Sequence, residues 1–420
     1  MDGIKIVLGA NYGDEGKGLV VDYFASETEA KTLVVRHSGG AQAGHTVVGP
    51  GGRHHIFHHV GAGALAGADT FLSRYFLSNP ILFLQEYEAL ADLPGRITVS
   101  PESLLTTPYD MIYNQMLEDL RGAGRHGSCG AGVAATMVRN KRDPRLHLKC
   151  GHLAAGGKKL KARLEGVRSY YHDLFDRALA DFDANAGQKL KYKSYLEDPV
   201  ILADFIDDCY LYLSRVELAG AEFGGESEHD LLHKYDRLIF EGSQGLLLDQ
   251  GHRNFPHVTY ANTGLRNAGE LISGNYLDES ANIEAVYVTR CYLTRHGAGP
   301  LPNELLEKPY PRVEDRTNTH NRYQGSLRYA YLDLDQLKES IENDLAGSAP
   351  RNLDVSLAIT CLDQLDDSFC YYYQGQLHTE KPQEALAVIF DVLKIKKAYL
   401  SYGPTRETVL LKSFDSVTIP

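Results

Sequence analysis

The first 24 residues constrain the fold most strongly, because they combine an apolar run, a glycine-rich turn and a helix-forming segment. Residues 4–8 (IKIVL) are typical of a strand buried in a parallel sheet. The turn GANYGDEGKG at 9–18 follows, and residues 19–24 (LVVDYF) read as the first turns of an amphipathic helix. This order points backbone N–H groups and a helix dipole at a phosphate. The sequence therefore predicts an α/β fold with a P-loop-like phosphate loop.

The spacing of this loop differs from that of the common P-loop. Six residues separate Gly9 from Gly16-Lys17, whereas about four stand there in the P-loop, which also has Ser or Thr after the lysine. Gly18 takes the place of that hydroxyl, so a Mg²⁺ ion bound with the phosphates needs another ligand. Asp14 is the obvious candidate, because Mg²⁺ prefers carboxylates and phosphate oxygens. A generic P-loop kinase or GTPase is disfavoured.

Composition limits the partners and the compartment. The net charge of −12 over 420 residues argues against nucleic acid or an anionic membrane as the main partner, so anionic substrates need local binding clusters. The six cysteines include no CxxC pair, which is typical of reduced thiols. We see no signal peptide and no apolar run long enough to span a bilayer. We therefore expect a soluble, cytoplasmic protein.

Strands followed by polar or glycine-rich loops recur from one end of the chain to the other. This pattern predicts one large, mostly parallel central sheet in a single α/β domain covering residues 1–420, with ligands at the carboxyl edge of the sheet. Residues from about 158 to 218 show apolar positions at helical spacing, which predicts a helical excursion packed as core. The histidine-rich segment 53–59 (RHHIFHH) is interpreted as a short strand around Ile56 and Phe57 rather than a metal site, because no acidic or cysteine partner lies nearby in sequence. The strands and their loops are expected at 4–18, 32–48, 237–249, 285–300, 356–363 and 397–406.

Five motifs in this order resemble the adenylosuccinate synthetase family, whose enzymes join aspartate to IMP with GTP as the energy source. They are GDEGKG at 13–18, AGHT at 43–46, EGSQG at 241–245, TRHGAGP at 294–300 and YGPTR at 402–406. The resemblance covers nearly the whole chain. It implies a ligase of purine nucleotide biosynthesis that uses IMP, L-aspartate, GTP and Mg²⁺ and acts as a homodimer.

The resemblance also implies catalytic roles. Asp14 is expected to take the N1 proton of the purine, so that its 6-oxygen can attack the γ-phosphate of GTP. His45 is expected to act as the general acid that spreads charge off the transferring phosphoryl group. Lys17 would hold phosphates and Gln244 would orient the 6-oxygen. Asp14 and the Gly44 carbonyl would bind Mg²⁺.

For the GTP site, the resemblance implies Gly13, Glu15, Gly16, Lys17, Gly18, Thr46, Asp363, Ser401, Gly403 and Pro404. Asp363 would read the guanine in Cys361-Leu362-Asp363, where the family has Lys-Leu-Asp. Glu15 could instead serve only as a charge at the N-terminus of the helix.

For IMP, the resemblance implies Asp14, Gln42, Ser128, Cys129, Arg142, Gln244 and Thr259. The family typically has two threonines at Ser128-Cys129 and Asn at Gln42. It also places an arginine of the neighbouring subunit on the monophosphate, and both Arg139 and Arg142 are near that position.

For aspartate, the resemblance implies a loop rich in threonine and arginine before a strand. Here the loop is 318–328, in which Arg322, Gln324 and Arg328 are the candidates. Two arginines suffice for a bidentate grip on a dicarboxylate.

Two alternative functions stay open. Some phage relatives use dGMP and ATP to make 2-aminoadenylosuccinate, but in those the turn aspartate is a serine and the guanine-reading aspartate is lost. Asp14 and Asp363 therefore favour IMP and GTP here. A non-catalytic nucleotide-binding relative acting in regulation or defence would be expected to have lost the base, the acid or the phosphate lysine, yet Asp14, His45 and Lys17 are all present.

Overall fold

A ten-stranded sheet runs through the centre of the computed structural model, which describes residues 3–27, 29–90, 95–277, 281–315, 318 and 322–413. Its order is β19-β18-β15-β11-β1-β10-β2-β5-β7-β9, and every neighbouring pair is parallel except β18 with β19. The strands are β1 (Gly3–Gly9), β2 (Thr32–Arg36), β5 (Asp69–Leu72), β7 (Ile97–Val99), β9 (Glu217–Leu218), β10 (Arg237–Gly245), β11 (Ile283–Arg290), β15 (Leu353–Thr360), β18 (Lys397–Ser401) and β19 (Val409–Ser413). The expected large, mostly parallel sheet is confirmed, and all six predicted strands belong to it.

The opening strand β1 lies at the middle of this sheet, between β10 and β11. Because these strands are parallel and in register, Gly9 at the end of β1 is paired with Gly245 of β10 and Val288 of β11. The loops that follow the three strands therefore meet at one edge of the sheet, where ligands bind in open α/β folds.

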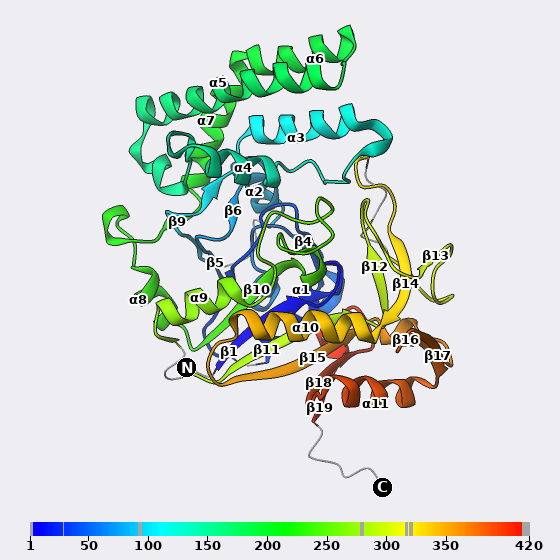
Figure 1. The fold of residues 1–420 in the computed structure, drawn as a ribbon. Helices are drawn as coiled ribbons and strands as arrows, with labels where there is room; N and C mark the ends of the chain where they lie inside the picture. Colours follow the sequence, from blue (N-terminus) through cyan, green and yellow to red (C-terminus); the bar gives the residue numbers. More distant parts are fainter. Residues whose placement is uncertain are drawn as a thin grey trace.

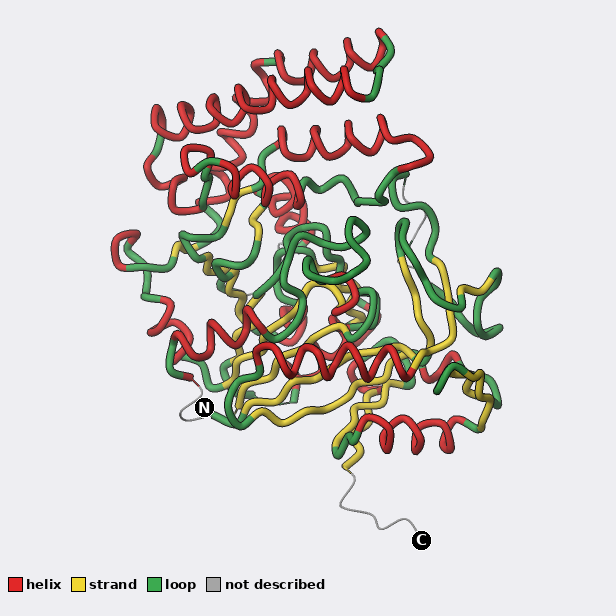
Figure 2. The backbone as a smooth tube through the Cα atoms, in the orientation of Figure 1, coloured by secondary structure: helices red, strands yellow, loops and turns green. Residues whose placement is uncertain are grey.

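Helices cover both faces of the sheet, as Figures 1 and 2 show. Ile4, Ile6 and Leu8 of β1 point to one face and pack with α9 (Arg266–Gly274) and α10 (Leu334–Ser348). Val7 points to the other face and packs with α1 (Lys17–Ser26). The amphipathic character expected for α1 is wrong, because eight of its ten residues are buried. The helix packs on β1, on β3 and on the turn at Arg406–Thr408, which cover it from several sides.

The helical excursion forms the upper part of the molecule in Figure 1. The segment expected at about 158–218 contains α5 (Gly157–Asp181), α6 (Ala186–Glu197) and α7 (Pro199–Leu213). The predicted apolar stripe of α5 is core, with Leu160, Leu164 and Val167 buried. The remaining helices are α2 (Pro80–Ala89), α3 (Pro108–Arg121), α4 (Val133–Arg142), α8 (Glu228–His233) and α11 (Pro382–Leu393).

Smaller sheets flank the central one. The hairpin of β3 (His45–Val48) and β4 (His54–Phe57) confirms the strand at the histidine-rich segment.

No group of three or more His, Cys, Asp or Glu residues in the described ranges is placed to hold a metal ion. None of the described helices has the length and apolar character needed to cross a membrane. The other strands are β6 (Leu77–Ser78), β8 (Leu104–Leu105), β12 (Tyr292–Arg295), β13 (Glu304–Leu305), β14 (Arg328–Asp333), β16 (Phe369–Tyr373) and β17 (Gln376–Glu380).

Candidate active site

A cleft of about 790 Å³ opens between the carboxyl edge of the central sheet and the helical excursion. Its walls come from the loops after β1, β2 and β10, from the segment before α4 and from the turn after β12. Residues that are far apart in the sequence therefore meet in one cavity. The predicted site residues that line it are Gly13, Asp14, Gln42, Gly44, Thr46, Ser128, Cys129, Arg142, Gln244, Thr259 and Gln324.

The phosphate loop is closed around an internal ion pair. Lys17 is buried, and its Nζ donates to the Gly13 carbonyl at 2.5 Å and lies 3.0 Å from Glu15 Oε2. The other oxygen of Glu15 accepts from the backbone N–H groups of Asn11 at 3.1 Å and Gly13 at 2.7 Å. Glu15 thus satisfies the donors that a bound phosphate also needs, and it does more than add charge to a helix end.

Steric crowding explains why a glycine, Gly18, follows Lys17. A Cβ at Gly18 would lie 2.9 Å from the Thr46 carbonyl oxygen and 3.1 Å from His45 Cβ. The Ser or Thr of a common P-loop cannot fit here, because β3 passes directly over the start of α1. The first two loops therefore pack together, and this packing brings His45 to the phosphate loop.

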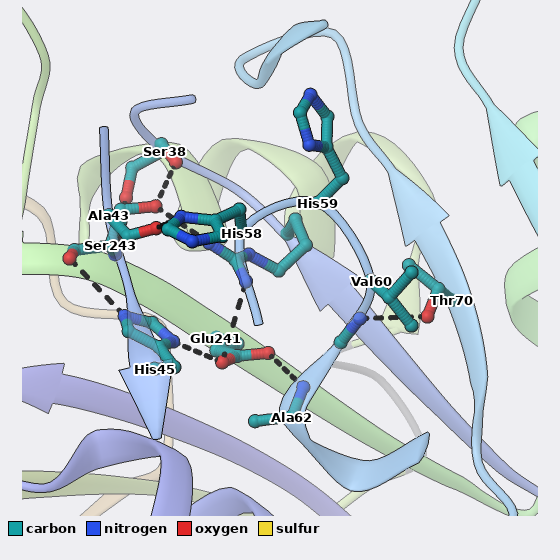
Figure 3. A network of polar contacts seen from close by, with 12 residues as sticks. Ser38, Ala43, His45, His58, His59, Val60, Ala62, Thr70, Glu241 and Ser243 are labelled. Carbon is teal, nitrogen blue, oxygen red and sulfur yellow. Dashed lines mark hydrogen bonds and ion pairs between the residues drawn. The ribbon is translucent and has the colours of Figure 1, made fainter. Parts of the chain in front are cut away.

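His45 is held by a buried acidic residue that the sequence analysis did not assign (Figure 3). Its Nδ1 contacts Glu241 Oε1, and its Nε2 lies 3.3 Å from the Ser243 carbonyl oxygen. Glu241 also accepts from the Ala62 N–H at 3.0 Å and lies 3.6 Å from the Arg36 guanidinium. The available signal was the position of this glutamate, directly after the apolar run at 238–240, because a buried carboxylate needs partners.

Burial and the ion-pair partner have opposite effects on the pKa values of His45 and Glu241. Burial lowers the pKa of His45, and the Glu241 carboxylate acts in the opposite direction by stabilising the imidazolium. Burial also disfavours the Glu241 carboxylate, but Arg36 and His45 outweigh it and lower the pKa of Glu241. Glu241 is therefore the charge that favours the protonated form of His45 in a dry site.

Asp14 lies at the mouth of the phosphate loop, with its side chain 25% exposed. Its carbonyl oxygen accepts from Arg290 Nε, which fixes the backbone of the turn. Gln244 lies against the same turn, since a Cβ at Gly13 would be 3.2 Å from its Oε1. The side-chain amide atoms of Gln42 are buried at the cleft without a hydrogen-bond partner in the described part of the chain. An orphaned amide of this kind suits a ligand contact.

The structure separates the two arginines considered for the monophosphate. Arg139 is fully buried, and its Nε and Nη2 donate to Asp110 at 2.9 and 3.0 Å. Arg142 is exposed and lines the cleft, so only this arginine is available to a ligand or a neighbouring subunit. Ser128 Oγ accepts from Asn114 at 2.8 Å, and burial raises the pKa of the Cys129 thiol.

The two arginines expected to bind aspartate make other contacts. Arg322 pairs with Asp119 at 2.9 Å, and Arg328 donates to the carbonyl oxygens of Gly297 and Gly299 at 2.9 and 2.8 Å. Neither lines the cleft, whereas Gln324 does. Their roles stay predictions, and residues 319–321 of the expected loop lie outside the described residues.

The expected guanine site lies on neighbouring strands. Asp363 is exposed just beyond β15, and Ser401 ends β18, which pairs with β15. Ser401 Oγ donates to the Gly403 carbonyl at 2.8 Å, and Thr360 Oγ1 donates to the Glu15 carbonyl at 2.8 Å. The last residue of β15 thus ties these loops to the phosphate loop. Their contact with a nucleotide base stays a prediction.

Comparison with known proteins agrees with this arrangement. The sequence profile of the family described as adenylosuccinate synthetase matches residues 6–401. The chain belongs to the adenylosuccinate synthetase family. The match includes every predicted site residue from Gly13 to Ser401, so the family sequence extends across the whole cleft. The reaction class that comes with the family is that of a ligase in purine biosynthesis.

Curated adenylosuccinate synthetases are similar over most of the chain. The protein from Desulfosudis oleivorans is 30% identical over 387 residues, which is 90% of this chain and 83% of that protein. The protein from Neisseria gonorrhoeae is 31% identical over 360 residues, which is 83% of this chain and 77% of that protein. In both comparisons the aligned region covers more than four fifths of this chain.

Two solved structures share the fold. The fully ligated adenylosuccinate synthetase from Plasmodium falciparum has a TM-score of 0.71 at 18% identity and covers 98% of this chain and 100% of its own. The succinoaminodeoxyadenylate synthetase of cyanophage S-2L, bound to dGMP and dATP, has a TM-score of 0.60 at 16% identity and covers 98% of this chain and 95% of its own. At these identities the likeness concerns the fold, which both kinds of enzyme use.

Proposed function

We propose that this enzyme joins L-aspartate to IMP with GTP, forming adenylosuccinate through a 6-phosphoryl intermediate in the cytoplasm. The observation that carries the proposal is the meeting of Asp14, Gln42 and Gln244 in one cleft, with His45 held behind it by Glu241. A base, a buried acid and amides for the purine are the groups that phosphorylation of a purine 6-oxygen requires.

In the first step, Asp14 accepts the N1 proton of the purine, and the 6-oxygen attacks the γ-phosphate. His45 in its protonated form stabilises the negative charge on the transferring group, and Glu241 stabilises that cation. Lys17 exchanges its contact with Glu15 for the phosphates, or shares it with them. In the second step, the amine of aspartate displaces the phosphate from C6.

The donor set suits Mg²⁺. Asp14 and the Gly44 backbone both line the cleft, and Mg²⁺ prefers carboxylate, carbonyl and phosphate oxygens. Among the residues described, no competing cluster of histidines or cysteines stands at this position. Mg²⁺, when bound here, neutralises charge on the phosphates.

A second candidate uses dGMP as the acceptor and ATP as the donor. Gln42 and Cys129 depart from the family pattern at the expected monophosphate site, as does the aspartate loop, and these departures keep the alternative open. Asp363 favours guanine in the donor and therefore the leading proposal.

The experiment mixes purified protein with aspartate and Mg²⁺ and each combination of IMP or dGMP with GTP or ATP, and identifies products by mass. Adenylosuccinate from IMP and GTP is expected. If only the combination of dGMP and ATP gives a product, the leading proposal is wrong and the second candidate is supported. No product in any combination, with nucleotide binding intact, would favour the regulatory alternative.

We also propose a homodimer in which Arg142 reaches the monophosphate of the neighbouring subunit. The resemblance places an arginine of the neighbouring subunit on the monophosphate, and Arg142 is exposed and therefore accessible to a second copy of the chain. At an IMP concentration far below the raised KM of the Arg142→Ala variant, where neither variant turns over alone, mixing Arg142→Ala with Asp14→Ala subunits should restore part of the activity if Arg142 acts across a dimer. An active species that sediments as a monomer would contradict the proposal.

A further inference from the structure

His296 lies where the expected amino-acid loop meets the phosphate loop. It follows β12 in the TRHGAGP motif, lines the cleft and is 17% exposed in its side chain. Its Nε2 lies 3.0 Å from Asn318 Oδ1, at the start of the amino-acid loop, and 3.5 Å from Asp14 Oδ2, on the phosphate loop. No role has been assigned to this side chain in the preceding sections.

A chain of hydrogen bonds determines the orientation of the His296 ring. Asn318 donates from its Nδ2 to Asp315 Oδ2 at 2.7 Å and from its backbone N–H to Asp315 Oδ1 at 2.9 Å. Asp315 is in turn paired with Arg290 at 3.1 Å. Because the amide nitrogen of Asn318 faces a carboxylate, its oxygen must face His296. Nε2 of His296 is therefore the donor in that bond.

The remaining ring nitrogen is then an acceptor. In a neutral imidazole that donates from Nε2, Nδ1 carries the lone pair. Nδ1 of His296 is buried and has no hydrogen-bond partner among the residues that the structure describes. Leaving a buried acceptor without a donor is destabilising, so such groups in native sites meet a ligand or water.

The backbone around His296 is held rigidly. Arg328 donates to the carbonyl oxygens of Gly297 and Gly299. A Cβ at Gly127 would lie only 2.7 Å from the Ala298 nitrogen, so the segment before α4 packs directly on this turn. The backbone next to His296 is therefore held in place by these contacts, and a residue that positions a substrate group requires such a fixed backbone.

We infer that Nδ1 of His296 accepts a hydrogen bond from the amino group of the amino-acid substrate and aligns it for attack. The inference rests on the proposed function, in which Asp14 lies beside the purine ring and the amino-acid loop holds the carboxylates. His296 touches both. The amine donates one N–H to Nδ1 and keeps its lone pair for the purine carbon. The C–N bond forms, the bond from C6 to the phosphorylated oxygen breaks, and the phosphate leaves with the electron pair and the amine proton.

The test uses a matched pair of substitutions. His296→Asn keeps an oxygen acceptor at the position of Nδ1, whereas His296→Leu has the same branched shape without an acceptor. Single-turnover formation of adenylosuccinate reports both steps. Scrambling of a bridging oxygen isotope in GTP, with IMP present and aspartate absent, reports phosphoryl transfer alone. The KM for aspartate is measured in parallel.

We expect His296→Leu to lower single-turnover product formation by about 10- to 100-fold, the factor that corresponds to one lost orienting hydrogen bond, and to raise the KM for aspartate. We expect isotope scrambling to stay within about threefold of the wild-type rate, and His296→Asn to recover most of the loss. Equal losses in the Asn and Leu variants, or a scrambling rate that falls as far as product formation, would overturn the inference.

If His296→Leu does not fold, a second variant can still test the inference. Asn318→Leu removes the acceptor that fixes the ring, and it should slow product formation while leaving scrambling intact. An unchanged rate in Asn318→Leu would count against the inference. The exposed His229→Gln is the matched histidine control, because His229 contacts Asp230 and His233 and does not line the cleft. A wild-type enzyme that makes no adenylosuccinate would refute the proposed function itself, whereas an active enzyme with a fully active His296→Leu variant refutes only the inference.

Discussion

Glu241→Gln removes one negative charge beside His45 while changing the shape of the side chain very little. The carboxylate contacts His45 Nδ1, lies 3.6 Å from Arg36 and is completely buried. An amide at this position can still accept from the Ala62 N–H, but it no longer stabilises the imidazolium. The substitution therefore tests whether the charge of Glu241, and not its volume, supports catalysis.

The size of the effect follows from the contact that is lost. A hydrogen bond to a charged group contributes about 1.5–3 kcal/mol, which corresponds to roughly 10- to 100-fold in rate if only protonated His45 is active. Because the Glu241 carboxylate favours the imidazolium, removing its charge should also lower the pKa of His45. Burial already lowers the pKa of His45, and Glu241 is the group that opposes it. Removing Glu241 shifts the pKa further down, so the alkaline limb of the rate profile moves to lower pH.

The assay is the pH dependence of isotope scrambling in GTP with IMP, which isolates the phosphoryl transfer. Glu284→Gln serves as the control, because Glu284 is also buried and paired, with Lys5 and Lys397, but lies outside the cleft. An unpaired Arg36 could cost about 3–5 kcal/mol of stability, so urea unfolding must show that Glu241→Gln is folded in the assay. A folded Glu241→Gln enzyme with the wild-type rate and an unmoved alkaline limb would refute the reasoning.

Further predictions concern stability and the two arginines. Burial opposes ionisation of Glu284, but Lys5, Ser356 and Lys397 outweigh it and lower its pKa from 4.5 to about 2, so Glu284→Gln should reduce the unfolding free energy at pH 7 by about 3 kcal/mol. Because the folded pKa is the lower one, this difference should shrink as the pH falls below about 4.5 toward 2, and a difference that grows with acid would contradict the assignment. Arg139→Met should lower the unfolding free energy by about 3–5 kcal/mol, since it leaves Asp110 buried without its partner. Arg142→Ala should leave urea unfolding nearly unchanged and raise the KM for the nucleotide, and the reverse pattern would show that the two arginines have exchanged roles.

Much of the fold could be predicted because its signals are local. The strands at residues 4–8 and 237–240 are short apolar runs, and each is followed by a glycine-rich loop, so their place in a parallel sheet follows from composition and order. The short strand predicted around Ile56 and Phe57 is also present, as β4. The burial of α1 on several sides was not predicted: an amphipathic helix was expected there, and only tertiary packing decides how many sides of such an apolar segment are covered.

The sequence by itself determined which chemical groups are present and the order in which they occur: the phosphate loop with Lys17 and Asp14, the histidine at 45 and the five motifs. Only the tertiary structure decided which of these groups meet. Glu241 reaches His45 across 196 positions because β10 lies between β1 and β2 in the sheet. Arg139 turns inward to Asp110 while Arg142 faces the cleft, and His296 joins Asn318 to Asp14. Such contacts depend on which strands lie side by side and on which elements pack together, and local periodicity, which shows only the apolar face of one element, does not specify either.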